Sequence, residues 1–140
     1  MHPPRILAVD DAPEILALVG KILTSQGYQV LAAGDGAAAI AACQHVGGEI
    51  DLLVTDVMMP GISGVELAEK LTATYPAIPV LLISGQCDES VLNDSVGRFH
   101  FLAKPFLPQA LLGAVEETLA LRSLRRKSAG SFTDCSKLSA

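Results

Sequence analysis

Residues 51–71 read DLLVTDVMMPGISGVELAEKL, and this stretch decides the fold class. It opens with a short apolar run that leads to Asp56 and continues through a loop with a Pro-Gly pair. A helix-start signal follows, in which Ser63 precedes Glu66 by three residues, and apolar residues then recur at helical spacing. A short buried strand that leads into an amphipathic helix is the repeating unit of a parallel sheet covered by helices.

The same alternation extends from this unit toward both ends of the chain. Apolar runs predict five strands, at residues 5–9, 28–32, 51–55, 79–84 and 99–103. Helical spacing predicts five helices, at residues 13–27, 37–44, 63–74, within 85–95 and at 108–126. We therefore expect an α/β domain over residues 1–126, a doubly wound five-stranded parallel sheet with five helices, and a flexible tail over 127–140.

Length and composition limit the chain to one such domain. It has 140 residues, of which 50% are hydrophobic and 18% are charged, so a second large domain does not fit. The apolar runs are far shorter than the ~20 residues that a membrane-spanning helix needs. We therefore expect a cytoplasmic protein without a membrane span.

The charge balance argues against nucleic-acid binding. Ten Lys and Arg residues against fifteen Asp and Glu residues give a net charge of -5, which disfavours a sequence-independent grip on phosphates. A local basic cluster lies near the end of the last predicted helix, at Arg122, Arg125, Arg126 and Lys127. Cations at a helix C-terminus complement the helix dipole, and we favour this interpretation over a nucleic-acid or partner patch.

The cysteines and histidines do not form a metal or disulfide pattern. The three cysteines, Cys43, Cys87 and Cys135, are an odd number without CxxC spacing, which argues against a disulfide framework and a zinc site. The three histidines are scattered along the chain and show no ligand spacing. We interpret them as structural or solvated residues.

Polar residues follow four of the predicted strands. Asp10 and Asp11 follow the first strand, Asp56 the third, Ser84 ends the fourth and Lys104 follows the fifth. Ligands of open parallel sheets bind outside the carboxyl ends of the strands, so these side chains are expected to converge there. Three crowded carboxylates repel one another, and a hard divalent cation such as Mg²⁺ relieves that repulsion through oxygen ligands.

This arrangement is suited to phosphoryl transfer. Asp56, which is central in the sheet, is placed to act as a carboxylate nucleophile. Mg²⁺ and Lys104 would neutralise the charge on the phosphoryl oxygens, and Ser84 can donate a hydrogen bond to the same oxygens. The Lys104–Pro105 bond is one that can be cis, which would aim the lysine toward the site.

With these four motifs in place, the chain resembles a response-regulator receiver domain of two-component signalling. The matching motifs are the acidic pair, the segment 56–64 (DVMMPGISG), Ser84-Gly85 and Lys104-Pro105-Phe106, in the same order and at the same spacing. The resemblance covers residues 5 to about 122. It implies the strand order 2-1-3-4-5.

The resemblance also implies a role for each residue of the site. Asp56 would accept a phosphoryl group from a phosphohistidine of a sensor kinase or phosphotransfer protein. Asp11, Asp56 and the backbone carbonyl of Met58 would hold Mg²⁺, and Asp10 would act mainly through a bound water. Lys104 would pair with the Asp56 carboxylate and then with the phosphoryl oxygens. The chain would catalyse only its own phosphorylation and dephosphorylation, and so would not be an enzyme.

A two-state switch follows from the same resemblance. Ser84 would move toward the phosphoryl group and Phe101 would turn inward behind it, although composition alone favours Phe101 as a core aromatic. The readout would lie on the face made by the fourth helix, the fifth strand and the fifth helix, with Val91, Phe101, Leu112 and Val115 as candidates. That face would bind an unknown downstream protein, with no direct DNA contact, and a homodimer through it is possible.

Met58 departs from relatives, in which a polar residue often stands two positions after the acceptor aspartate. A thioether is only a weak hydrogen-bond acceptor, so we expect slow loss of the phosphoryl group, unless Gln86 orients a water instead. A phosphatase of the haloacid-dehalogenase type would need a second aspartate where Met58 stands. An inactive receiver-like scaffold that only binds partners is the other alternative, although the full set of site residues is present.

Overall fold

The computed structural model describes the backbone over residues 3–85 and 99–130, and side chains up to residue 120 of the last helix. Five parallel strands form one sheet in the order β2-β1-β3-β4-β5, which confirms the predicted fold class and strand order. The strands are β1 (Arg5–Val9), β2 (Gln29–Ala33), β3 (Leu52–Asp56), β4 (Val80–Ser84) and β5 (His100–Ala103).

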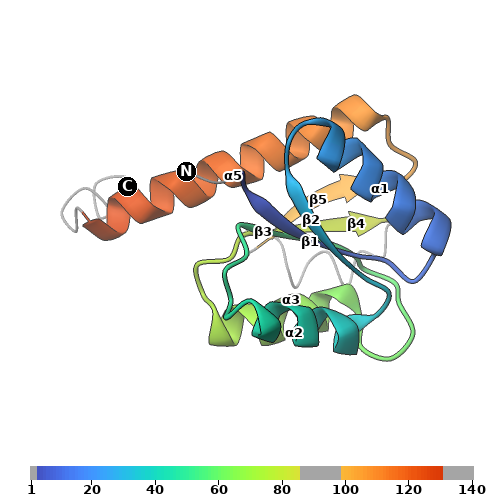
Figure 1. Ribbon diagram of the computed structural model, residues 1–140, viewed down its shortest axis with the longest axis horizontal. Helices are drawn as coiled ribbons and strands as arrows, with labels where there is room; N and C mark the ends of the chain where they lie inside the picture. The colour runs from blue at the N-terminus through green and yellow to red at the C-terminus, as the bar shows by residue number, and fades with distance from the viewer. Residues whose placement is uncertain (1–2, 86–98, 131–140) are drawn as a thin grey trace.

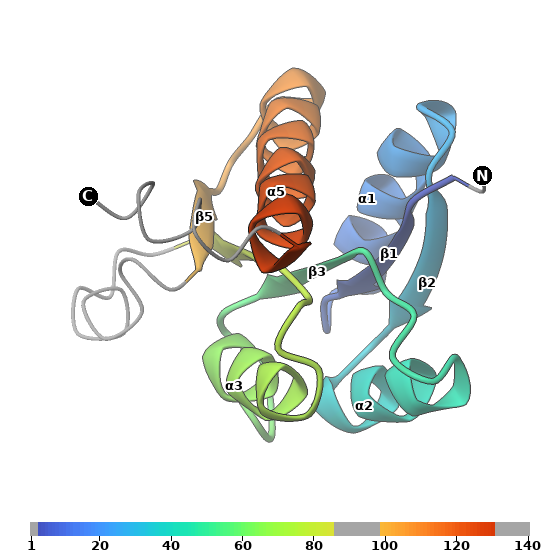
Figure 2. The same ribbon diagram turned by 90° about the vertical axis from the view of Figure 1, so that its left-hand side faces the viewer.

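Helices cover both faces of this sheet, as Figure 1 and the end view of Figure 2 show. α1 (Pro13–Ser25) and α5 (Pro108–Gly130) lie on one face, and α2 (Gly36–His45) and α3 (Gly64–Thr74) lie on the other. Each helix follows a strand, so the chain alternates between the sheet and its covering layers. This is the doubly wound arrangement that the alternation of strands and helices predicts.

The alternation of side chains along each strand explains why the sheet has two cores. In β1, Ile6 and Ala8 pack in the cluster with α1 and α5, whereas Leu7 and Val9 pack in the cluster with α2 and α3. Successive side chains of a strand point to opposite faces, so a continuous apolar run serves both layers. All four of these residues are buried, as expected for a strand in the interior of a parallel sheet.

Local signals fix the ends of several helices as predicted. Pro13 is the first residue of α1, and Gly27 follows its end with φ +89°, a conformation that glycine adopts without steric cost. The Ser63 hydroxyl accepts a hydrogen bond from the Glu66 backbone N–H at 3.2 Å, which caps α3. The Asp35 carboxylate caps α2 by accepting from the Ala38 N–H at 2.8 Å, a cap that the sequence analysis did not predict.

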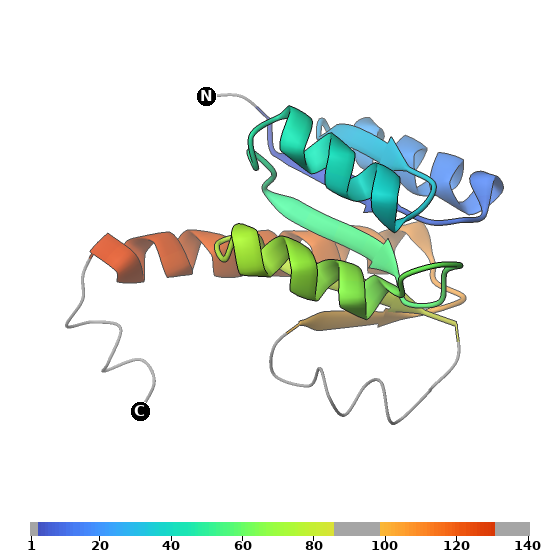
Figure 3. The ribbon, with the colours of Figure 1, turned by 90° about the horizontal axis from the view of Figure 1, so that it is seen from below.

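The structure differs from the sequence predictions at some boundaries. β4 and β5 begin one residue later than predicted, and β2 and β3 are shifted by one residue. α2 begins at Gly36, which was predicted to lie in a turn. The predicted helix within 85–95 lies almost entirely outside the described residues. α5 continues to Gly130, four residues past the predicted end at 126, and its last turns extend beyond the sheet (Figure 3).

Within the described parts of the chain, none of the helices is long and apolar enough to span a membrane.

Candidate functional site

The register of the strands brings the predicted site residues to one edge of the sheet. Val9 of β1 pairs with Thr55 of β3, so the residues that come next, Asp10 and Asp56, lie beside each other. On the other side of β3, Ser84 at the end of β4 pairs with Ala103 of β5, and Lys104 follows directly. The carboxyl ends of four neighbouring strands therefore supply the site, as the sequence predicts.

Three carboxylates form the centre of this site. Asp10, Asp11 and Asp56 each contribute one oxygen atom to a group whose members all lie within 4.8 Å of one another. Asp10 and Asp56 are only 5% and 7% exposed, whereas Asp11 is exposed to solvent. Two nearly buried carboxylates in contact with a third create a strong local demand for positive charge.

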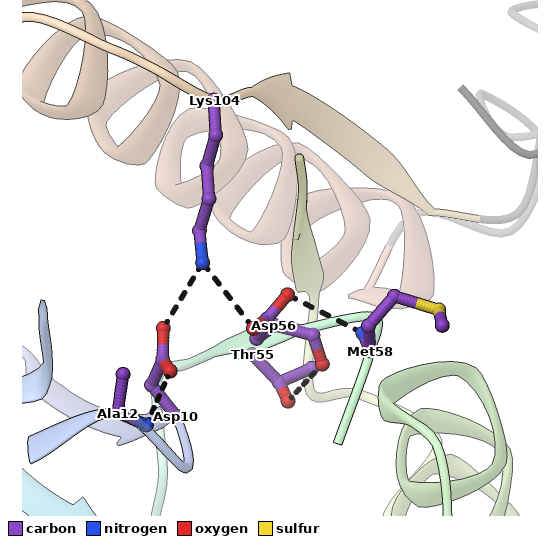
Figure 4. A network of polar contacts seen from close by, with 6 residues as sticks. All are labelled: Asp10, Ala12, Thr55, Asp56, Met58 and Lys104. Atoms are coloured by element: carbon purple, nitrogen blue, oxygen red, sulfur yellow. Dashed lines mark hydrogen bonds and ion pairs between the residues drawn. The ribbon is translucent and has the colours of Figure 1, made fainter. Parts of the chain in front are cut away.

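Lys104 supplies part of that positive charge. Its Nζ lies 3.2 Å from Oδ2 of Asp56 and 3.4 Å from Oδ2 of Asp10, so it bridges the two buried carboxylates (Figure 4). The Lys104 backbone N–H donates to the Ser84 carbonyl at 2.9 Å. The Lys104–Pro105 peptide bond is cis. Among the described residues, Lys104 is the cation that contacts this group of three carboxylates, so the cluster keeps an excess of negative charge.

Backbone groups hold the carboxylates in place. Oδ1 of Asp10 accepts a hydrogen bond from the Ala12 N–H at 2.9 Å, and Oδ1 of Asp56 accepts from the Met58 N–H at 3.3 Å (Figure 4). The buried Thr55 hydroxyl donates to the Asp56 backbone carbonyl at 3.0 Å. Each buried aspartate thus has one oxygen fixed by the backbone and the other bound by Lys104.

The electrostatic environment perturbs both Asp56 and Lys104. Burial raises the pKa of Asp56, and the charge of Asp10 adds to this, although Lys104 and the Met58 N–H act in the opposite direction. For Lys104, burial alone would lower the pKa, but attraction to Asp56 and Asp10 outweighs it and the pKa is raised. The lysine therefore stays charged, and it does not fully compensate the cost of ionising Asp56.

The donor set fits a hard divalent cation. Three carboxylate oxygens within 4.8 Å of one another, one of them on an exposed side chain, are the ligand type that Mg²⁺ takes while it keeps several waters. The excess negative charge of the cluster favours a cation at the same place.

The remaining predicted residues lie at the same edge or just behind it. Met58 is 59% exposed at the mouth of the site. Phe101 is half-buried in β5, where it pairs with Leu82 and packs against the apolar cluster on the α2 and α3 face. Of the candidates for the readout face, Leu112 is half-buried and Val91 lies outside the described residues.

Val115 was wrongly placed on that face. It is fully buried in the core with α1 and α5 and is not part of a surface. It falls on the inner side of α5, four residues after the equally buried Leu111.

The sequence predicts that Lys104 pairs with Asp56, and sequence reasoning missed the direct contact of Lys104 with Asp10. The register of β1 against β3 was the missing information, because it places Asp10 beside Asp56 and within reach of the same lysine. A sequence pattern shows that both residues follow strands, but not how the strands align.

The known proteins to which this chain is similar are receiver domains or contain one. Residues 6–116 match the sequence profile of the response regulator receiver domain. The probable transcriptional regulatory protein TcrX of Mycobacterium tuberculosis is 33% identical over 136 residues, which are 95% of this chain and 54% of that protein. The sensor kinase CckA of Brucella abortus is 33% identical over 116 residues, or 81% of this chain and 12% of that protein. The chain thus spans about half or less of these curated relatives.

A solved structure shows the same architecture. The receiver domain protein of Methanospirillum hungatei JF-1 superposes with a TM-score of 0.82 at 27% identity, and the match covers 88% of this chain and 98% of that one. Receiver domains are signalling domains, generally not classed as enzymes, that interact with histidine kinases or phosphotransfer proteins and bind Mg²⁺ at an acidic pocket. The cluster of Asp10, Asp11 and Asp56 is an acidic pocket of this kind. The chain belongs to the response regulator receiver domain family of two-component systems.

Proposed function

We propose that this chain is a phosphorylation-dependent switch in which Asp56 accepts a phosphoryl group from a phosphohistidine of a sensor kinase or phosphotransfer protein. The observation that carries this proposal is the bridge of Lys104 between two buried carboxylates, 3.2 Å from Asp56 and 3.4 Å from Asp10. A lysine held at the acceptor carboxylate is placed to neutralise phosphoryl oxygens as they arrive.

The transfer exchanges one bond to phosphorus for another. A carboxylate oxygen of Asp56 forms a bond to phosphorus, the bond between phosphorus and the donor histidine nitrogen breaks, and the electron pair stays on the imidazole. Asp56 is held for this attack by the Met58 N–H on one oxygen and Lys104 on the other. Lys104 can then turn from the carboxylate to the new phosphoryl oxygens.

A Mg²⁺ ion is the cofactor of this proposal. Asp11, Asp56 and the backbone carbonyl of Met58 would hold it, with Asp10 acting mainly through water. When bound, the ion neutralises charge on the phosphoryl oxygens and orients them for in-line transfer. The excess of carboxylates over lysine in the site supports this assignment.

The switch would be read through Ser84 and Phe101. Ser84 ends β4 beside the backbone of Lys104, from where its hydroxyl can move toward a phosphoryl group on Asp56. Phe101 is half-buried, so part of its side chain is still exposed, and we expect it to turn further inward. We expect the change to reach the face formed by the segment after β4, β5 and α5, and to alter the binding of a downstream protein. Homodimerisation through this face stays a prediction.

The receiver portion itself is not expected to bind DNA. The matched curated relatives include transcriptional regulators, but this chain spans only part of their length. Its net charge of -5 gives no general attraction to phosphates. Its catalysis would be limited to its own phosphorylation and dephosphorylation.

Intact-mass measurement after incubation with acetyl phosphate and Mg²⁺ tests the proposal. We expect one added phosphoryl group in the wild-type chain and in Asp35→Asn, a matched change of an exposed aspartate that still caps α2. We expect none in Asp56→Asn or in the presence of EDTA. An unlabelled wild-type chain that also fails to bind beryllofluoride would instead indicate a receiver-like scaffold that binds partners without phosphorylation.

A further inference from the structure

The loop over residues 57–63 joins β3 to α3 and carries Met58, whose backbone carbonyl is one of the proposed Mg²⁺ ligands. Its start is tied to the sheet, because the Val57 N–H donates to the Ile83 carbonyl at 2.9 Å and the Met58 N–H donates to Asp56. Its end is tied back to its start, because the Gly64 N–H donates to the Val57 carbonyl at 2.9 Å. Within the described parts of the chain, residues 59–62 in the middle of the loop make no backbone–backbone hydrogen bond.

Gly64 fixes the far end of the loop by backbone contact. It is buried, and a Cβ atom built on it would overlap the backbone carbonyl of Asp56 and press on the Cα of Val57. These neighbours are main-chain atoms that cannot rotate away. The first residue of α3 therefore lies directly against the backbone of the acceptor aspartate and cannot shift toward it.

A second close approach involves the middle of the loop. A Cβ atom built on Gly36, the first residue of α2, would overlap Cγ1 and Cδ1 of Ile62. The isoleucine side chain therefore occupies the space that any larger residue at position 36 would need. Ile62 is half-buried and packs against the apolar core on this face of the sheet. Gly36 thus lets the loop lie close over the start of α2.

We propose that the packing of Ile62 on Gly36 sets the position of the Met58 carbonyl, which makes Gly36 and Ile62 positioning residues for the Mg²⁺ site. The proposal rests on the proposed function, because it takes Met58 as a ligand. Since Gly64 holds the loop at its far end, a displacement of Ile62 is taken up by residues 58–61. Gly61 in this segment has φ +80°, so the backbone bends sharply between Ile62 and Met58.

Alanine substitutions separate this role from a general effect on folding. Gly36→Ala introduces the overlapping Cβ, whereas Gly34→Ala, in the same connection between β2 and α2, adds a Cβ that meets nothing within 4 Å. Ile62→Ala in the Gly36→Ala background removes the overlapping atoms. It leaves the two Cβ atoms 3.8 Å apart, an ordinary van der Waals contact with the loop in its original place.

The measurement is a Mg²⁺ titration of ¹⁵N-labelled protein, followed at the amides of Asp10 and Asp56. We expect Gly36→Ala to shift the Met58 amide before Mg²⁺ is added and to weaken Mg²⁺ binding about tenfold, as loss of support for a metal ligand commonly does. Gly34→Ala should match the wild-type protein. The double variant, which lacks the overlapping atoms, should recover most of the affinity and return the Met58 amide toward its wild-type position.

Two results would overturn the inference while the proposed function stands. The first is that Gly36→Ala changes neither the chemical shift of the Met58 amide nor the Mg²⁺ affinity. In that case the Ile62 side chain has turned into the open hollow of about 380 Å³ that Ile62 and Lys70 border. The second is a double variant no better than Gly36→Ala alone. A wild-type chain that binds no Mg²⁺ would overturn the proposed function, and the inference with it.

Discussion

At the scale of single residues, the burial of the ionised Asp56 carboxylate lowers the free energy of unfolding. Burial foremost raises its pKa, so the folded chain binds the proton more tightly than the unfolded chain. The free energy of unfolding that this tighter proton binding contributes is fully present below the pKa of Asp56 in the unfolded chain. It is lost as the pH rises through the raised pKa of the folded chain. At neutral pH without Mg²⁺, we expect Asp56→Asn to raise the melting temperature by a few degrees, because it removes this charge.

The pH dependence checks the cause of that effect. The stability difference between Asp56→Asn and the wild-type protein should grow as the pH rises from about 4 toward neutral, measured by thermal unfolding in EDTA. Asp35→Asn is the matched control, because the exposed Asp35 only caps α2 and asparagine caps equally well. A lower melting temperature for Asp56→Asn across this range would show that its pairing with Lys104 outweighs burial.

At Met58, we expect the side chain to affect the half-life of the aspartyl phosphate. It stands 59% exposed two positions after Asp56 and offers only a thioether near the acceptor. Met58→Asn supplies an amide that can orient a water, and we expect it to shorten the half-life of the aspartyl phosphate by about tenfold, below the usual range for full general acid–base catalysis. Decay of the added mass after removal of acetyl phosphate measures this.

Met58→Leu is the control for that measurement and should keep the wild-type half-life, because it preserves an apolar side chain of similar size. An unchanged half-life in Met58→Asn would contradict the prediction and would leave water positioning to another residue.

At the scale of elements, two helical glycines should respond oppositely to alanine. In α5, a Cβ at the exposed Gly113 meets nothing within 4 Å, so Gly113→Ala should stabilise the chain by up to about 1 kcal/mol through helix propensity. In α3, a Cβ at Gly64 would overlap the Asp56 backbone, so Gly64→Ala should destabilise it by about 3 kcal/mol. Urea unfolding measures both, and equal effects of the two changes would contradict this account.

Local elements could be predicted from the sequence, whereas contacts between separate segments could not. The apolar run 52–54 and the capping signal at Ser63 are local, so the strand and the helix could be predicted from them. The convergence of the acidic residues at one edge of the sheet could be predicted because the strands are parallel. The contacts of Gly36 with Ile62 and of Lys104 with Asp10 depend on how separate segments align in space. Val115 was misplaced for a different reason: its spacing of four residues from Leu111 already puts both residues on the apolar side of α5, which meets the sheet.

At the scale of the whole molecule, we propose that residues 1–126 are the receiver domain and that residues 127–140 are a tail that folding does not require. Among the side chains of α5 that the structure describes, which end at residue 120, the buried ones are Leu111, Val115 and Thr118. The helix backbone then extends past the sheet (Figure 3). Deletion of residues 127–140 should therefore leave the melting temperature and the acetyl phosphate reaction unchanged. Leu111→Ala, which opens a cavity in the core with α1, should instead cost about 3 kcal/mol. A deletion as damaging as Leu111→Ala would place part of the tail in the fold.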